Sequence, residues 1–119
     1  MKEVVVKLEH VPKMSPTVEQ LERIGGRRWQ NNDADRIYFQ LPELMGLETT
    51  HYKTGHISGA TYRGERISNS EARRIGDKFF SAKLWFDVQT GKFFSSGLSA
   101  EDARYAVSVI NGLINKEEE

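Results

Sequence analysis

The sequence contains no cysteine and no excess of either charge. Without cysteine there is no disulfide framework and no thiolate chemistry, so we expect a reducing, intracellular setting. The 17 basic and 17 acidic residues give a formal net charge of zero, whereas proteins that bind bulk duplex nucleic acid usually carry a basic excess. This balance still permits a small phosphorylated ligand that is held by a few local arginines.

Long apolar runs are also missing. No segment has enough consecutive apolar residues to span a bilayer, and residues 1–7 lack the apolar core of a signal peptide. We therefore expect a cytoplasmic protein without membrane association. Its 119 residues are enough for one hydrophobic core but not for two, which predicts a single domain over residues 1–119.

Known catalytic and cofactor motifs are absent as well. His10, His51 and His56 are scattered and have no metal-ligand spacing such as HExxH. The glycines form neither a P-loop nor a dinucleotide fingerprint, and there is no GxSxG nucleophile motif. We therefore expect no enzymatic activity, no catalytic residue, no metal site and no cofactor.

Capping signals predict where the first two helices begin and end. Ser15 fits the N-cap of the first helix and Pro16 its first position, while Gly25-Gly26 fits a left-handed C-cap. Ser68 fits the N-cap of a second helix that ends near Phe79. Glu71 then lies three residues after the cap, at the capping-box spacing.

A last helix is predicted after Ser99, because apolar residues repeat there at helical spacing, and residues 116–119 are expected to be a frayed tail. The strands are expected in pairs joined by short polar turns. Their expected positions are a first strand at 4–6, a hairpin over 27–41, extended segments over 48–53 and 60–62, and a hairpin over 82–96. These elements predict an α+β fold: an antiparallel sheet built from hairpins, of about five to seven strands, with two or three helices packed on it.

The helix start at Ser68 is also a candidate anion site. A helix N-terminus offers unpaired N–H donors and the positive end of a dipole, which suit a phosphate. Four arginines flank it in the sequence (Arg63, Arg66, Arg73 and Arg74), and Glu65 and Glu71 offset part of their charge. Most capped helix starts bind no ligand, so the structural and the anion-binding interpretations both stay open.

The hairpin over 27–41 is a second candidate, because Arg28, Trp29, Arg36 and Tyr38 lie at or near it. Alternation places Arg36 and Tyr38 on one face, which suits a phosphate beside a stacked base. The alternative is a solvated sheet face, with Trp29 in the core. Arg104, one turn into the last helix, could reach the same region or could be an ordinary surface arginine.

Four further aromatic residues, Trp85, Phe86, Phe93 and Phe94, lie in the hairpin over 82–96. Their simplest role is in the core. Alternatively, one exposed pair marks a subunit interface.

Six short segments carry a resemblance to a known family. They are Gly26–Trp29, Asp35–Phe39, Gly46-Leu47, Tyr52–Gly55, Gly64–Ala72 and Phe86–Gly91. This pattern, spread over most of the chain after residue 25, resembles small phage proteins of the first Thoeris anti-defence family. The resemblance implies a non-enzymatic sponge that binds glycocyclic ADP-ribose, and in some members cyclic di- or trinucleotides, without degrading the ligand.

The same resemblance implies a homo-oligomer, a dimer or a hexamer, in the cytoplasm of an infected host cell. By this resemblance Arg28 and Arg104 contact phosphates, and Trp29 or another aromatic supports the adenine. Ser68, Asn69, Ser70 and Arg74 are then candidates for a second site that takes cyclic oligonucleotides. A sponge also needs a largely enclosed pocket, which dimerisation could complete.

Two other classes of function remain open. One is a phage inhibitor that acts by direct protein–protein binding, as anti-CRISPR proteins do, for which substitutions at Trp85 and Phe94 would matter more than those at Arg28 and Arg36. The other is a small single-stranded nucleic-acid-binding module that uses the arginines and aromatics on an open sheet face. The zero net charge counts against that module.

Overall fold

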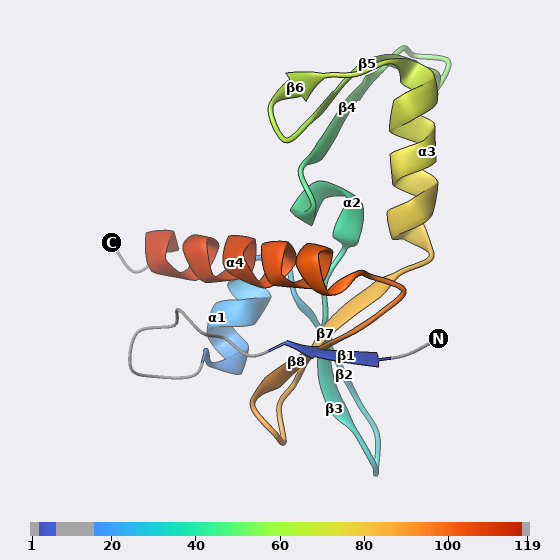
Figure 1. Ribbon diagram of the computed structural model, residues 1–119. Helices are drawn as coiled ribbons and strands as arrows, with labels where there is room; N and C mark the ends of the chain where they lie inside the picture. The colour runs from blue at the N-terminus through green and yellow to red at the C-terminus, as the bar shows by residue number, and fades with distance from the viewer. Residues whose placement is uncertain (1–2, 7–15, 118–119) are drawn as a thin grey trace.

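The computed structural model describes residues 3–6 and 16–117, which form eight strands and four helices. In chain order the elements are β1 (Glu3–Val6), α1 (Val18–Arg23), β2 (Arg27–Gln30), β3 (Asp35–Tyr38), α2 (Leu41–Leu44), β4 (Leu47–His51), β5 (Ile57–Tyr62), β6 (Glu65–Arg66), α3 (Asn69–Phe80), β7 (Lys83–Asp87), β8 (Lys92–Ser96) and α4 (Ala100–Glu117). Figure 1 shows their arrangement.

The strands pair in antiparallel fashion, which confirms the predicted α+β class. They form two sheets, however, where one was expected. The larger sheet has the order β1-β8-β7-β3-β2 and the smaller one the order β4-β5-β6. In Figure 1 the smaller sheet and α3 lie at one end of the molecule, and α4 crosses between them and the larger sheet. The strands divide because the smaller sheet has its own helix to pack on.

The contacts between α3 and the smaller sheet explain this division. One face of α3 buries Ala72, Ile75 and Phe79. The Phe79 ring stacks on Tyr62 of β5, with 6.4 Å between the ring centroids. This narrow apolar stripe covers one side of a short three-stranded sheet.

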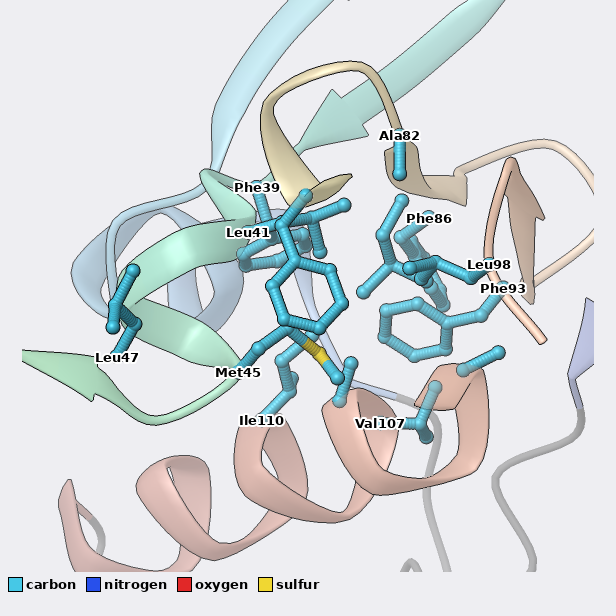
Figure 2. Packing of buried hydrophobic residues seen from close by; sticks show 14 of the residues in the cluster. Phe39, Leu41, Met45, Leu47, Ala82, Phe86, Phe93, Leu98, Val107 and Ile110 are labelled. Carbon is cyan, nitrogen blue, oxygen red and sulfur yellow. The ribbon is translucent and has the colours of Figure 1, made fainter. Parts of the chain in front are cut away.

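The main core lies between the larger sheet and α4. One face of the sheet contributes Ile37, Leu84, Phe86 and Phe93, and α4 contributes five residues to the same cluster: Ala103, Ala106, Val107, Ile110 and Ile114. Figure 2 shows the packing of this cluster. Phe86 and Phe93 meet edge to face, with 5.0 Å between the ring centroids. Burial of each of these side chains stabilises the fold by about 2 kcal/mol. Both belong to the buried cluster, which confirms their predicted core role.

The first helix begins two residues later than the sequence predicted. Thr17 is the N-cap of α1, and its side chain accepts from the backbone N–H of Gln20 while the Gln20 side chain accepts from the N–H of Thr17. The expected start at Ser15-Pro16 is therefore wrong, because this reciprocal capping box fixes the start at Thr17. Ser15 itself lies outside the described residues. The expected left-handed end is confirmed by Gly25, with a φ of 103°.

The other two predicted caps are confirmed. Ser68 Oγ accepts from the N–H of Glu71, 3.1 Å away, and Ser99 Oγ accepts from the N–H of Asp102, also 3.1 Å away. The Glu71 side chain pairs with Arg74 rather than completing the expected capping box. The last helix also runs to Glu117, so residues 116 and 117 are helical and not a frayed tail.

Arg63 connects the smaller sheet to the rest of the molecule. It precedes Gly64 in the turn between β5 and β6, and both residues have positive φ, 51° and 85°. Its guanidinium lies 3.8 Å from the ring centroid of Tyr105, and its Nη2 lies 3.5 Å from Oδ1 of Asp102. Its Nε donates to the carbonyl oxygen of Met45, 3.3 Å away. Since Tyr105 and Asp102 belong to α4, this one side chain joins the two parts of the fold.

Candidate functional site

The larger sheet has a second face, which points away from the core and is called the outer face here. Arg36 and Tyr38 lie on this face. Residues that are paired across an antiparallel sheet lie on the same face, so the strand register identifies the others. Its described side chains are Arg27, Trp29, Arg36, Tyr38, Lys83, Trp85, Asp87, Lys92, Phe94 and Ser96. Eight of them lie in two rows: Trp29, Arg36, Asp87 and Lys92 in one, and Arg27, Tyr38, Trp85 and Phe94 in the next. Lys83 and Ser96 pair beyond the second row.

An aromatic cluster forms the centre of the outer face. The ring centroids of Tyr38 and Trp85 are 5.7 Å apart, and those of Trp85 and Phe94 are 5.9 Å apart and nearly parallel. Trp85 is only 3% exposed. The expected burial is therefore confirmed for Trp85, although its ring packs on the outer face and not in the main core, while Phe94 is half-buried. A protein-binding role for an exposed pair of these four aromatics loses its basis, because Trp85, Phe86 and Phe93 are all buried.

Arg36 lies over this cluster. Its Cζ atom is 4.8 Å from the ring centroid of Trp85, and its Nη1 donates to the hydroxyl oxygen of Tyr38, 3.1 Å away. Alternation in β3 predicted that Arg36 and Tyr38 share a face, and their hydrogen bond confirms it. The guanidinium is thus held in one orientation by an aromatic ring and a hydroxyl.

Trp29 is the exposed aromatic of the outer face. It lies directly opposite Arg36 in the β2–β3 register, and 48% of its surface is exposed. The alternative that placed Trp29 in the core is therefore wrong, because β2 lies at the edge of the sheet, where all four of its residues are exposed.

Basic residues dominate the charge of the outer face. Over β2, β3, β7 and β8, the outer face carries the cations Arg27, Arg36, Lys83 and Lys92 and the acid Asp87. The Asp87 carboxylate serves the turn after β7, because it accepts from the N–H of Gln89 and the hydroxyl of Thr90, each 3.1 Å away. The neutral chain therefore presents a positively charged surface here.

Lys83 and Lys92 were not among the residues that the sequence singled out. Alternation along the hairpin over 82–96 could have placed both with Trp85 on one face. The sequence does not predict that β3 pairs with this hairpin and contributes to the same face.

Arg28 does not join the predicted cluster. It pairs with Ile37, so its side chain lies on the opposite side of the sheet from Trp29. There it forms a two-pronged ion pair with Asp35, with Nε–Oδ1 and Nη2–Oδ2 distances of 3.0 and 2.7 Å. The Arg28 guanidinium lowers the pKa of Asp35, and the carboxylate raises the pKa of Arg28.

The predicted second site, at the start of α3, is separate from the outer face (Figure 1). Ser68 caps the helix, and Asn69 Nδ2 donates to the carbonyl oxygen of Ile57, 2.9 Å away. Arg74 is paired with Glu71 and lowers the pKa of that carboxyl. Ser70 is exposed. These contacts give Ser68, Asn69 and Arg74 structural roles at the helix start.

Arg104 also lies away from the outer face. It is exposed on α4, and α4 packs against the inner face of the sheet through residues such as Ala103 and Val107. The sheet therefore separates Arg104 from Trp29 and Arg36. Of the sequence-predicted residues, the structure brings together Trp29, Arg36 and Tyr38.

Metal-binding and membrane-spanning features are considered for residues 3–6 and 16–117, the described part of the chain. Within these ranges, no three or more His, Cys, Asp or Glu side chains form a group that could hold a metal ion. The same part of the chain contains no helix with the length and apolar character needed to cross a membrane.

Comparisons with known proteins do not extend this description. No protein-family model, curated protein or solved structure matches the chain. Functional inference therefore rests on the chemistry of the outer face.

Proposed function

We propose that this protein binds a nucleotide on the outer face and sequesters it without altering it. The observation that carries the proposal is the position of Trp29 directly opposite Arg36, with about half of the Trp29 surface exposed. A base stacked on an indole gains about 1–3 kcal/mol. Strand β3, which carries Arg36, lies about 5 Å from β2. A phosphate attached to that base would extend across β3 to the guanidinium, which lies over Trp85.

The fixed orientation of Arg36 supports this proposal. An arginine already positioned by Tyr38 and Trp85 loses little side-chain entropy when it binds an anion. Its planar donors match the geometry of a phosphate. The excess of basic residues on the outer face attracts the same kind of ligand.

The resemblance to the first Thoeris anti-defence family narrows the ligand class. Under this proposal the ligand is a signalling cyclic nucleotide, such as glycocyclic ADP-ribose or a cyclic di- or trinucleotide. The protein is then a non-enzymatic phage sponge that acts as a homo-oligomer in the cytoplasm of the infected cell. Trp29, Arg36 and Tyr38 form its ligand site, and Arg28 contributes by holding the hairpin through Asp35.

The test is sequestration followed by recovery of the ligand. The protein is mixed with glycocyclic ADP-ribose or with a cyclic di- or trinucleotide, the free ligand is removed by filtration, and the protein is then heated. The released nucleotide is identified by mass. We expect depletion of at least one ligand and its recovery unchanged, whereas a cleaved product would make the protein an enzyme.

Matched variants test the site. Trp29→Ala should weaken binding about tenfold or more through the lost stacking, while Tyr52→Ala, at an aromatic that is 63% exposed in the loop after β4, should not. Arg36→Ala should also weaken binding, and Arg73→Ala, at an exposed arginine of α3, should not. Equal binding by all four variants would reject the outer face as the site.

A second candidate is a module for single-stranded nucleic acid, and the spread of the cations favours it. Trp29 and Lys92 lie at the two ends of one row, three strand spacings or about 14 Å apart. An open face of this width fits a short, extended segment of single-stranded nucleic acid. Binding of a labelled oligothymidylate that weakens steeply with salt would support this candidate, and no binding at low salt would reject it.

A further inference from the structure

Strand β2 is an open edge of the larger sheet. It pairs with β3 on one side, and within the described residues no strand pairs with it on the other. All four of its residues, Arg27–Gln30, are exposed. Such an edge presents backbone donors and acceptors that can pair with another chain.

The hydrogen-bond pattern identifies the backbone groups that point outward. The N–H of Asn31 donates to the carbonyl oxygen of Ala34 across the turn, 2.9 Å away. Because paired residues in an antiparallel ladder alternate, Trp29 and Arg27 also bond to β3. The N–H and C=O groups of Arg28 and Gln30 therefore point away from the sheet.

Other contacts on β3 agree with this alternation. Phe39 donates its N–H to the carbonyl oxygen of Leu84, 3.2 Å away, and Asp35 accepts from the N–H of Val88, 3.0 Å away. The odd-numbered residues of β3 thus bond to β7. Its even-numbered residues are left to bond to β2.

Strand β2 lacks proline, lysine and a bulge, three features that often block the addition of a strand. Natural edges are often protected by proline, lysine or a bulge. The β4 edge of the smaller sheet has a register shift at Thr50 and His51. Strand β2 has regular register, no proline or lysine, and an exposed tryptophan, and its charged residues Arg27 and Arg28 restrict which strands can be added.

We infer that β2 accepts an extended, acidic segment of a partner protein as an added strand of this sheet. The charges next to the edge select the partner. On the outer face, Arg27 favours an acidic residue, and Trp29 favours an apolar or aromatic one. On the other face, Arg28 is already paired with Asp35, so a neutral polar residue suffices there.

This inference does not depend on the proposed nucleotide ligand, because the added strand bonds to backbone groups at the edge. The nucleotide site and the added strand both use Trp29, but only the added strand uses the backbone N–H of Gln30. Gln30→Pro removes one outward N–H and leaves the β2–β3 ladder intact. Gln30→Ala is the matched control, because both substitutions lose the hydrogen bond from Gln30 Nε2 to Asp35 and only the first loses the N–H.

The experiment selects peptides from a random displayed library on the purified wild-type protein, with counter-selection on Gln30→Pro. We expect the enriched peptides to be acidic and to bind wild type and Gln30→Ala alike. Their binding to Gln30→Pro should be about tenfold weaker or worse, since a backbone bond is lost and the proline ring obstructs pairing. Amide exchange should show new protection at Arg28 and Gln30. Circular dichroism establishes that each variant is folded.

Three outcomes would overturn the inference. One is that no enriched peptide distinguishes wild type from Gln30→Pro. Another is that the enriched peptides carry no acidic excess. The last is self-association of the wild type in sedimentation that Gln30→Pro abolishes, because the edge would then be occupied by a second copy of this chain. Retained nucleotide binding by Gln30→Pro keeps these outcomes separate from a failure of the proposed function.

Discussion

Replacement of Arg63 tests whether one side chain holds the two parts of the fold together. Arg63 is the only non-glycine residue with positive φ in the described part of the chain. A left-handed conformation costs an alanine about 1 kcal/mol more than a glycine. Arg63→Ala keeps this cost and loses the guanidinium, while Arg63→Gly loses the guanidinium and relieves the cost.

The contacts of the guanidinium set the size of the effect. Its stacking on Tyr105 contributes about 1 kcal/mol at this partly exposed position. The hydrogen bond to the carbonyl oxygen of Met45 contributes about 1.5 kcal/mol, and the ion pair with Asp102 less than about 1 kcal/mol. We therefore expect Arg63→Ala to lower the free energy of unfolding by about 3 kcal/mol and Arg63→Gly by about 2 kcal/mol.

Urea unfolding followed by tryptophan fluorescence and by circular dichroism measures these changes. Arg66→Ala is the control, because Arg66 is an exposed residue of the neighbouring strand β6 and its loss should change stability by less than about 0.5 kcal/mol. Equal stability of Arg63→Ala and Arg63→Gly would refute the conformational argument. If both match Arg66→Ala, the contacts with α4 do not stabilise the fold.

Two further substitutions test contacts at the hairpin and at α3. Asp35→Asn removes the carboxylate that pairs with Arg28, whose guanidinium lowers the pKa of Asp35. A carboxylate with a lowered pKa stabilises the fold above its unfolded pKa of about 3.9. This stabilisation is lost as the pH falls through the lower pKa of the folded state. The difference in urea midpoint between wild type and Asp35→Asn should thus shrink from about pH 6 to about pH 3, and a constant difference would contradict the ion pair. Ser68→Ala removes the N-cap of α3 and should cost about 1 kcal/mol. Ser70→Ala, at an exposed position, is its control, and equal midpoints for the two would argue against capping.

Local signals in the sequence predicted the local structure well. Ser68 and Ser99 were found because a hydroxyl before a helical apolar pattern can satisfy a free N–H. The start of α1 was missed because Ser15-Pro16 and Thr17 both satisfy the same rule. The capping-box spacing of Thr17 and Gln20 decides between them, and this spacing is visible in the sequence.

The division into two sheets, and the side of the sheet on which Trp29 lies, could not be predicted from the sequence. Strand partners such as β3 and β7 are distant in the chain, and no local pattern pairs them. Alternation within β3 grouped Arg36 with Tyr38. Whether Arg28 or Trp29 shares their face depends on the register across the turn, which the bond between Asn31 and Ala34 sets.

The pairing of β1 with β8 has a consequence for the order in which the protein folds during its synthesis. Val6 pairs with Phe93, so β1 cannot pair until β8 has left the ribosome. The hairpins and helix over residues 47–80 involve only short separations and can form earlier. Until β8 arrives, β1 is an unpaired strand of Glu-Val-Val-Val. A nascent chain from which β8 has not yet emerged would expose that strand to aggregation, whereas the released chain would not.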